Sequence, residues 1–188
     1  MPQFDGRPDV RDALNAELSG RVFPDTFPRA NAMRRSPAVF AILVGGGIAA
    51  TLDVTYAIVY SAFHGVSALR VLQSVASGLL GQPAYAGGVP TAILGFCLHF
   101  AMAFLVAAIF YLASRRLHFL TRQAVLSGLV YGIGVYLVMN FIVVPLSAFP
   151  TPLTFTPTRV AINLVAHMIL FGLPIALAAR AASARGRA

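Results

Sequence analysis

Residues 38–60 read AVFAILVGGGIAATLDVTYAIVY, an apolar run interrupted by one carboxylate, Asp53. Continued to Phe63, the run is long enough to cross a bilayer, which takes about 20 apolar residues in a helix. Asp53 is also the only acidic residue after position 25. A carboxylate at membrane depth is costly unless it is paired, hydrated or protonated. The run therefore predicts a membrane span in which Asp53 has a functional or structural use.

The composition of the whole chain agrees with a membrane protein. Of 188 residues, 58% are hydrophobic and 11% are charged, whereas soluble domains carry about 25% charged residues. All 14 basic residues are arginine, and they flank apolar runs. A nucleic-acid-binding protein would instead gather its basic residues on one face. We therefore expect the lipid bilayer, and no nucleic acid, as a partner.

Four apolar runs divide the chain. We expect spans at about 38–63, 91–113, 123–146 and 160–179, inside a membrane domain of residues 38–180. Residues 1–37 would form a cytoplasmic tail with a short amphipathic helix, since Val10, Leu14 and Leu18 fall on one helical face. Residues 181–188 would form a basic cytoplasmic tail.

The arginines also predict the orientation. Six precede the first span, three lie between the second and third spans, and three follow the fourth. The other two loops hold one each, Arg70 and Arg159. Because cytoplasmic loops are enriched in Lys and Arg, both termini are expected in the cytoplasm.

The two outer loops are not ordinary polar turns. Residues 64–90 are mostly apolar with helical spacing, which predicts an interfacial helix lying on the membrane or folded over the bundle. Residues 147–158 carry Pro150, Pro152 and Pro157, which predict a stiff cap without regular structure. The expected fold is thus an all-α, integral membrane four-helix bundle with an interfacial helix and a Pro-rich cap on the outer side.

Glycines at Gly128 and Gly132 have the GxxxG spacing that lets two helices approach closely. We expect internal packing first and a homodimer, or contact with a partner membrane subunit, second.

Polar residues occur at matched depth in all four spans. At about 1.5 Å per residue, five of them lie roughly 5–15 Å below the outer interface. Polar side chains that face lipid are costly, so these should turn into the bundle and line a polar pocket. Tyrosines are candidates for the walls of this pocket, and arginines for its entrance. The predicted ligand-binding residues are Asp53, His99, Asn140, Asn163, His167, Tyr56, Tyr136 and Arg159, with Tyr60 and Arg70 as further candidates.

Several kinds of chemistry fit these residue types. A carboxylate with two imidazoles suits a small ligand, an ion or a proton relay. Two facing histidines, His99 and His167, are what haem b requires as axial ligands. Asp53 can also pair with a histidine or with Arg159 and clamp the bundle, and the asparagines can serve as interhelical hydrogen bonds. No cofactor and no protein metal site is predicted, and haem b remains the alternative.

Enzyme signatures do not occur in the sequence. There is no HExxH, GxSxG or P-loop motif. Cys97 is the single cysteine, so no internal disulfide or Cys-based metal cluster can form. We therefore expect a protein without catalytic residues.

A family resemblance adds to this interpretation. The chain from the second span onward resembles the YagU-like family of uncharacterised bacterial inner-membrane proteins. The likeness lies in Leu98-His99-Phe100, in a basic loop leading to Gly128, in Pro145-Leu146 before the Pro150/Pro152 loop, and in Ala166-His167-Met168 with Arg180 beyond. Asn140 stands where the family pattern leads us to expect a histidine. The resemblance implies an inner-membrane protein and supplies no reaction.

The leading functional hypothesis is a non-enzymatic membrane protein that binds or passes a small ligand, ion or proton through this pocket. One alternative is a haem-b electron-transfer protein using His99 and His167. The other is a structural or accessory subunit of a larger membrane complex.

Overall fold

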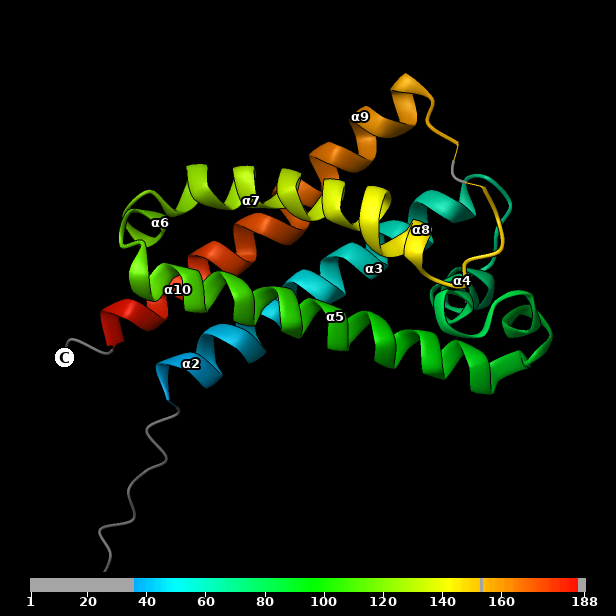
Figure 1. The fold of residues 1–188 in the computed structure, drawn as a ribbon, viewed down its shortest axis with the longest axis horizontal. Helices are drawn as coiled ribbons and strands as arrows, with labels where there is room; N and C mark the ends of the chain where they lie inside the picture. The colour runs from blue at the N-terminus through cyan, green and yellow to red at the C-terminus, as the bar shows by residue number, and fades with distance from the viewer. Residues whose placement is uncertain (1–35, 153, 186–188) are drawn as a thin grey trace, which may run out of the picture. The chain divides into compact units, whose positions relative to one another are not determined.

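The computed structural model describes residues 36–152 and 154–185, which belong to one compact unit. These residues form helices and loops, with no strand among them. Four helices are long and apolar enough to cross a membrane: Pro37–Ala62, Gly88–Arg116, Ala124–Leu146 and Pro157–Arg185. The predicted all-α membrane bundle is confirmed (Figure 1). The short helix predicted within residues 1–37 lies outside the described residues.

Each span is made of one or more helical segments. The first contains α2 (Pro37–Phe40), η1 (Ala41–Gly45) and α3 (Gly46–Ala62), and the second is α5 (Gly88–Arg116). The third contains α7 (Ala124–Val138), η3 (Met139–Val143) and α8 (Val144–Leu146). The fourth contains α9 (Pro157–Ala166), η4 (His167–Gly172) and α10 (Leu173–Arg185). Shorter helices α4 (Ala68–Leu80), η2 (Gln82–Ala86) and α6 (Phe119–Arg122) connect the spans.

The second and fourth spans are longer than expected. Span four begins at Pro157, because proline at the first helical position loses no intrahelical bond and its fixed φ suits the helix. Span two begins at Gly88, with Pro90 in its first turn. Pro157, which we expected in a stiff cap without regular structure, instead lies in the first turn of a helix.

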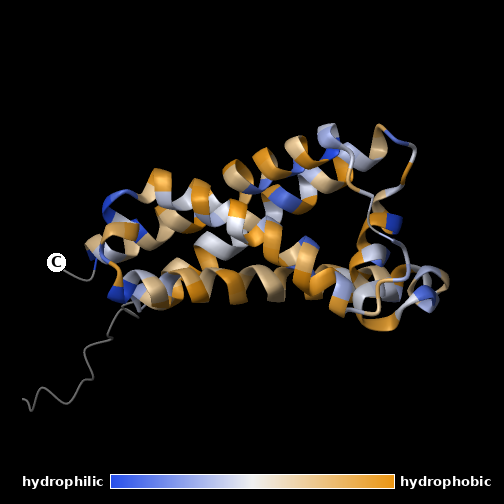
Figure 2. Cartoon of the chain, turned by 45° about the horizontal axis from the view of Figure 1, so that its top comes forward, coloured by the Kyte–Doolittle hydropathy of each residue, from blue (hydrophilic) through white to orange (hydrophobic). Residues whose placement is uncertain are grey.

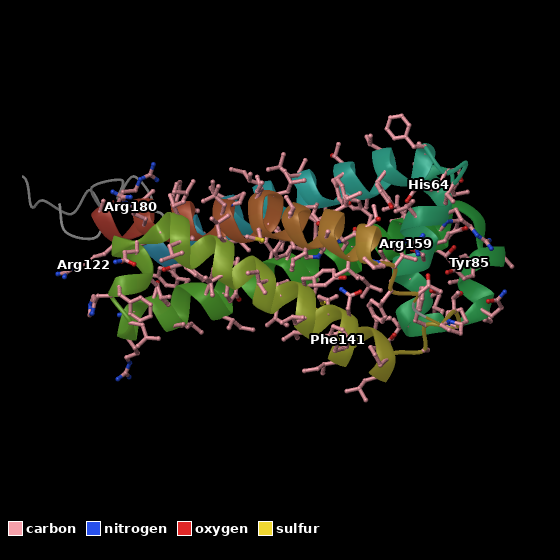
Figure 3. The ribbon with its side chains drawn as sticks, turned by 90° about the horizontal axis from the view of Figure 1, so that it is seen from above. His64, Tyr85, Arg122, Phe141, Arg159 and Arg180 are labelled. Atoms are coloured by element: carbon pink, nitrogen blue, oxygen red, sulfur yellow. The ribbon has the colours of Figure 1, made fainter. Side chains whose placement is uncertain are left out.

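The bundle has two distinct ends. The terminal end holds Pro37, α6 and Arg185, and the α4 end holds α4, η2 and the loop before α9. Figure 3 shows Arg122 and Arg180 at the terminal end, and His64, Tyr85 and Arg159 at the α4 end. Figure 2 shows hydrophobic residues along the helices between these ends. That is the distribution expected of helices in contact with lipid.

Prolines account for two of the three π-helical segments. Pro145 follows η3 and Pro174 follows η4. A proline inside a helix lacks the N–H donor and its ring clashes with the carbonyl four residues earlier. A widened π turn before the proline relieves that clash and bends the helix. Asn140 and His167 both lie in these widened turns.

Glycines let α7 cross the fourth span in close contact. A methyl group at Gly128 would lie 2.9 Å from the carbonyl oxygen of Gly172. A methyl group at Gly132 would collide with the backbone of His167 and Met168. The predicted use of Gly128 and Gly132 in packing inside one chain is confirmed, and Gly172 completes the contact.

Helix α4 is folded onto α5 at the α4 end. The Gln73 side chain is 3% exposed, and its Nε2 donates to the carbonyl of Gly88 at 3.0 Å. Gly95 permits this approach, since a methyl group there would collide with the backbone of Leu72. Of the two positions predicted for this segment, the structure shows the one folded over the bundle.

Two polar side chains of α4 are buried against the protein, whereas several of its leucines are exposed. Gln73 and Ser77 are buried, whereas Leu69, Leu79 and Leu80 are 41–61% exposed. The following loop is tied to α4, because the Ala148 N–H donates to the Gly78 carbonyl at 2.9 Å. The two segments predicted to cap the outer side therefore contact each other.

Candidate functional site

Asp53 and His99 meet between α3 and α5. His99 Nε2 lies 3.0 Å from the Ala50 carbonyl oxygen and 3.9 Å from Asp53 Oδ2. A carbonyl only accepts, so this hydrogen bond requires a proton on Nε2 of His99. The two side chains are 15% and 14% exposed. The predicted charge partner of Asp53 is thus next to it, beyond hydrogen-bond length.

His167 is held in the opposite way. Its Nδ1 lies 2.9 Å from the carbonyl oxygen of Asn163, one turn earlier. Nδ1 is therefore the protonated nitrogen, and in the neutral ring Nε2 carries a lone pair. The ring packs edge-on to Tyr136, with centroids 5.4 Å apart, and is stacked with Phe171 at 6.1 Å. These contacts fix the ring and direct an acceptor nitrogen away from its own helix.

Asp53, His99 and His167 line one cavity of about 420 Å³, which we call cavity 1. The three side chains come from α3, α5 and η4. Most of the wall is apolar, and the hydroxyls of Ser74 and Ser147 are its other polar groups. The apolar lining comprises Val75, Gly78, Leu79, Leu98, Met102, Ala103, Val106, Val135, Met139, Val143, Val144, Phe149 and Phe171.

Most of the other predicted site residues line a second cavity of about 370 Å³, which we call cavity 2. Tyr136, Asn140, Arg159 and Asn163 line it, together with part of the loop before α9. His167 and Phe149 line both cavities. The predicted single polar pocket is therefore divided into two neighbouring cavities, and His167 is the predicted site residue common to them.

The asparagines mostly bond within their own helices. Asn140 Nδ2 donates to the Tyr136 carbonyl at 2.9 Å, and Asn163 Nδ2 donates to the Arg159 carbonyl at 2.8 Å. One asparagine bond crosses between helices, from the Tyr56 hydroxyl to Asn163 Oδ1 at 3.2 Å. Tyr56 thus supports cavity 2 from behind rather than lining it.

The two arginines expected at the pocket mouth behave differently. Arg159 is exposed, donates to Thr154 Oγ1 at 3.0 Å and lines cavity 2. Arg70 lies over the ring of Tyr85, with 3.9 Å between its Cζ and the ring centroid. Arg70 therefore joins α4 to η2 through a cation–π contact and is not among the residues that line either cavity.

Metal-ligating side chains are few and scattered in the part of the chain that the structure describes. Among residues 36–152 and 154–185, no group of three or more His, Cys, Asp or Glu side chains could hold a metal ion. The cofactor prediction, including haem b on His99 and His167, stays a prediction. If haem were bound, His167 would offer Nε2, whereas His99 Nε2 donates to Ala50.

Several lining residues were missed at the level of sequence. Ser74 and Ser147 have short polar side chains that also occur as helix-internal hydroxyls bonded to a preceding carbonyl, as both are here. Phe149 lies in the proline-rich loop, for which no regular pattern exists. The proximity of Ser147 to Gly78 could not be predicted from periodicity, because it depends on how α4 folds back.

Comparison of the chain with protein-family models, with curated proteins and with solved structures finds no match. The resemblance to the YagU-like family therefore stays a prediction.

Proposed function

We propose that this protein is a non-enzymatic membrane protein that binds a small, largely apolar ligand in cavity 1. The main support is that Asp53, His99 and His167, from three different spans, line one cavity whose remaining wall is almost entirely apolar. Small-molecule sites have this character: a concave apolar wall with a few converging polar groups that fix orientation.

The volume and the polar groups narrow the ligand. A cavity of about 420 Å³ lies within the range of small-molecule pockets, about 300–1,000 Å³. His99 Nε2 already donates to Ala50, so it orients the ring rather than the ligand. His167 Nε2 and the Asp53 carboxyl oxygens remain as hydrogen-bond acceptors toward the cavity. We infer that His167 and Asp53 contact the polar end of the ligand.

The hydrogen bond of the His99 ring also favours this function over haem binding. Axial ligation by both histidines would require each ring to present a free nitrogen to one haem iron. The hydrogen bond from His99 Nε2 to Ala50 leaves only Nδ1 of that ring for a ligand.

We further propose that the α4 end faces the periplasm of a bacterial inner membrane and that both termini are cytoplasmic. The support is the arginine distribution, since Arg115, Arg116, Arg122, Arg180 and Arg185 lie at the terminal end and positive residues are enriched on the cytoplasmic side. Cavities 1 and 2 would then lie in the periplasmic half of the bilayer.

The test is retention of the natural ligand by protein purified in mild detergent. Compounds extracted from the wild type, Asp53→Asn and Thr55→Val are quantified by mass spectrometry per mole of folded protein. Thr55 is the control because it lies on α3 near Asp53 with its side chain exposed. Asp53→Asn replaces one of the two acceptor oxygens by an NH2 group, which cannot accept. Loss of one hydrogen bond, about 0.5–1.5 kcal/mol, should lower the retained compound about 2- to 10-fold, and Thr55→Val should keep it.

An absorbance spectrum and elemental analysis of the same sample separate the alternatives. A Soret band lost in His167→Ala would replace the proposal with the haem protein. Equal extraction from the wild type and Asp53→Asn would exclude Asp53 from the site.

A further inference from the structure

The lining residues show which helices form the walls of cavity 1. Asp53 of α3 and Phe171 of η4 form the back, α5 one side, and α7 with η3 the other. Figure 1 shows α5 and α7 joined at one end through α6, with α10 and α3 seen between them. The cavity therefore occupies the space between these two helices, in front of α3 and η4.

The terminal end of cavity 1 is closed by side chains. The Tyr131 hydroxyl of α7 donates to the Val106 carbonyl of α5 at 2.7 Å. The Tyr131 ring also packs edge-on against Phe110, with centroids 4.9 Å apart. Phe110 is 1% exposed. These contacts join α5 to α7 directly below the cavity.

The α4 end of cavity 1 is covered. Ser74, Val75 and Gly78 of α4 line it from that side, and Ser147 and Phe149 adjoin them. The hydrogen bond from Ala148 N–H to the Gly78 carbonyl ties this cover together. The α4 end of cavity 1 therefore lies under α4 and the loop that begins at Ser147.

The side between α5 and α7 is apolar and adjoins exposed surface. Leu98, Met102 and Val106 of α5 face Val135, Met139 and Val143 across the cavity. On each helix, exposed residues come directly before lining residues in the sequence: Leu105 is 55% exposed, Val138 46% and Ile142 51%. Leu79 lines the cavity and is itself 61% exposed. In a membrane, exposed apolar surface of this kind contacts lipid chains.

The two side chains with free acceptor atoms belong to the wall formed by α3 and η4. His167 and Asp53 belong to the back wall and present acceptor atoms. A molecule lying across the cavity thus meets hydrogen-bond acceptors at one end and lipid at the other.

We propose that cavity 1 opens sideways to the bilayer between α5 and α7 and takes a single-chain lipid-soluble molecule with a hydrogen-bond-donating head. The head, an alcohol or a similar O–H or N–H donor, bonds to His167 Nε2 and the Asp53 carboxyl. The alkyl chain of the ligand extends between Met102 and Met139 toward the lipid. This deepens the proposed function and rests on it, since it names the class of ligand and its route.

The chain contains no tryptophan, so one introduced tryptophan reports on its own position. Phe171→Trp places the reporter in the back wall of cavity 1, where Phe171 is 5% exposed. Phe110→Trp places it in a buried site outside the cavity. Ile169→Trp and Ile109→Trp are exposed neighbours that correct for depth, since Ile169 is 49% and Ile109 51% exposed.

Each variant is reconstituted in phosphatidylcholine vesicles containing either 9,10-dibromostearyl alcohol or the methyl ester of 9,10-dibromostearic acid. Bromine quenches nearby tryptophan, and the ester has the same chain but no donor. The alcohol should quench Phe171→Trp nearly as strongly as Ile169→Trp, and more strongly than the ester does at equal concentration. One hydrogen bond predicts about a 2- to 10-fold difference in occupancy. Phe110→Trp should be protected relative to Ile109→Trp from both probes.

Three results would overturn the proposal. Protection of Phe171→Trp equal to that of Phe110→Trp would mean that the cavity is closed to lipid. Equal quenching by alcohol and ester would mean that the donor head is not recognised. Strong quenching of Phe171→Trp by iodide on both sides of the vesicle would mean an aqueous opening.

Met139→Trp, at a half-buried lining position, repeats the measurement if Phe171→Trp does not fold. Failure of the lateral opening can be distinguished from failure of the proposed function. A natural ligand can be retained through Asp53 in a cavity that opens to water, and iodide quenching would reveal that case.

Discussion

His99 and His167 line the same cavity with opposite ring nitrogens engaged. His99 uses Nε2 toward Ala50, and His167 uses Nδ1 toward Asn163. The second nitrogen of each ring then has a different role, because a neutral imidazole has one donor and one acceptor. His167 offers an acceptor to the ligand. At the residue scale, the function of the site depends on which backbone carbonyl each ring meets.

The two rings should therefore be opposite tautomers. In the variant His64→Gln/His118→Gln, only His99 and His167 remain to be observed by ¹⁵N NMR of side-chain nitrogens. When both rings are neutral, we expect protonated Nε2 at His99 and protonated Nδ1 at His167. His167 bonds to the backbone carbonyl of residue 163, which every substitution there keeps. Asn163→Ala should therefore leave the His167 tautomer unchanged. The same tautomer at both positions would contradict the assigned hydrogen bonds.

Residue-scale packing also distinguishes two glycines of one helix. Gly132 contacts the backbone of the fourth span, whereas a methyl group at Gly134 would meet nothing within 4 Å. Gly132→Ala should destabilise the bundle by about 1–3 kcal/mol through overpacking. Gly134→Ala should be neutral or stabilising by up to about 1 kcal/mol, since alanine favours the helix. Unfolding in mixed detergent by denaturant measures both, and equal effects would argue against the close crossing.

At the scale of elements, α4 determines whether cavity 1 is covered. Its helical spacing was readable in the sequence, and so was its amphipathic character. Which face turns inward was not readable, because in lipid the buried face carries Gln73 and Ser77 and the outer face carries leucines. The usual rule of apolar residues inside applies to proteins in water, where the hydrophobic effect drives burial.

Docking of α4 should depend on Gly95. Gly95→Ala introduces a methyl group that collides with the backbone of Leu72, so α4 should move away from α5. Gly78→Ala is the control, as its methyl group would have ordinary contacts at 3.7 Å with Ser147. Hydrogen exchange of the α4 amides should rise in Gly95→Ala and remain near wild type in Gly78→Ala. Unchanged exchange in Gly95→Ala would show that α4 is not packed as described.

At the scale of the whole molecule, the number, order and approximate limits of the spans followed from sequence. Hydropathy decides these features because an unsatisfied backbone group in lipid is costly, so each apolar run must be a helix. The structure places Asp53, His99 and His167, which depth along each helix had grouped together, around one cavity. The division into two cavities was not predictable, since it depends on the widened turns before Pro145 and Pro174 and on the position of Phe149.

The central claim is that cavity 1 holds a small ligand, and filling it tests this most directly. Val143 lines cavity 1, whereas its neighbour Ile142 is 51% exposed. Val143→Trp should fill part of the cavity, and Ile142→Trp adds the same side chain on the lipid side. The measurement is native mass spectrometry of both variants and the wild type, released from nanodiscs made of native membrane lipid.

We predict one bound small molecule in the wild type and in Ile142→Trp, and its loss in folded Val143→Trp. A wild type without a bound molecule, or a Val143→Trp variant that keeps it, would contradict the assignment of cavity 1 as the binding site.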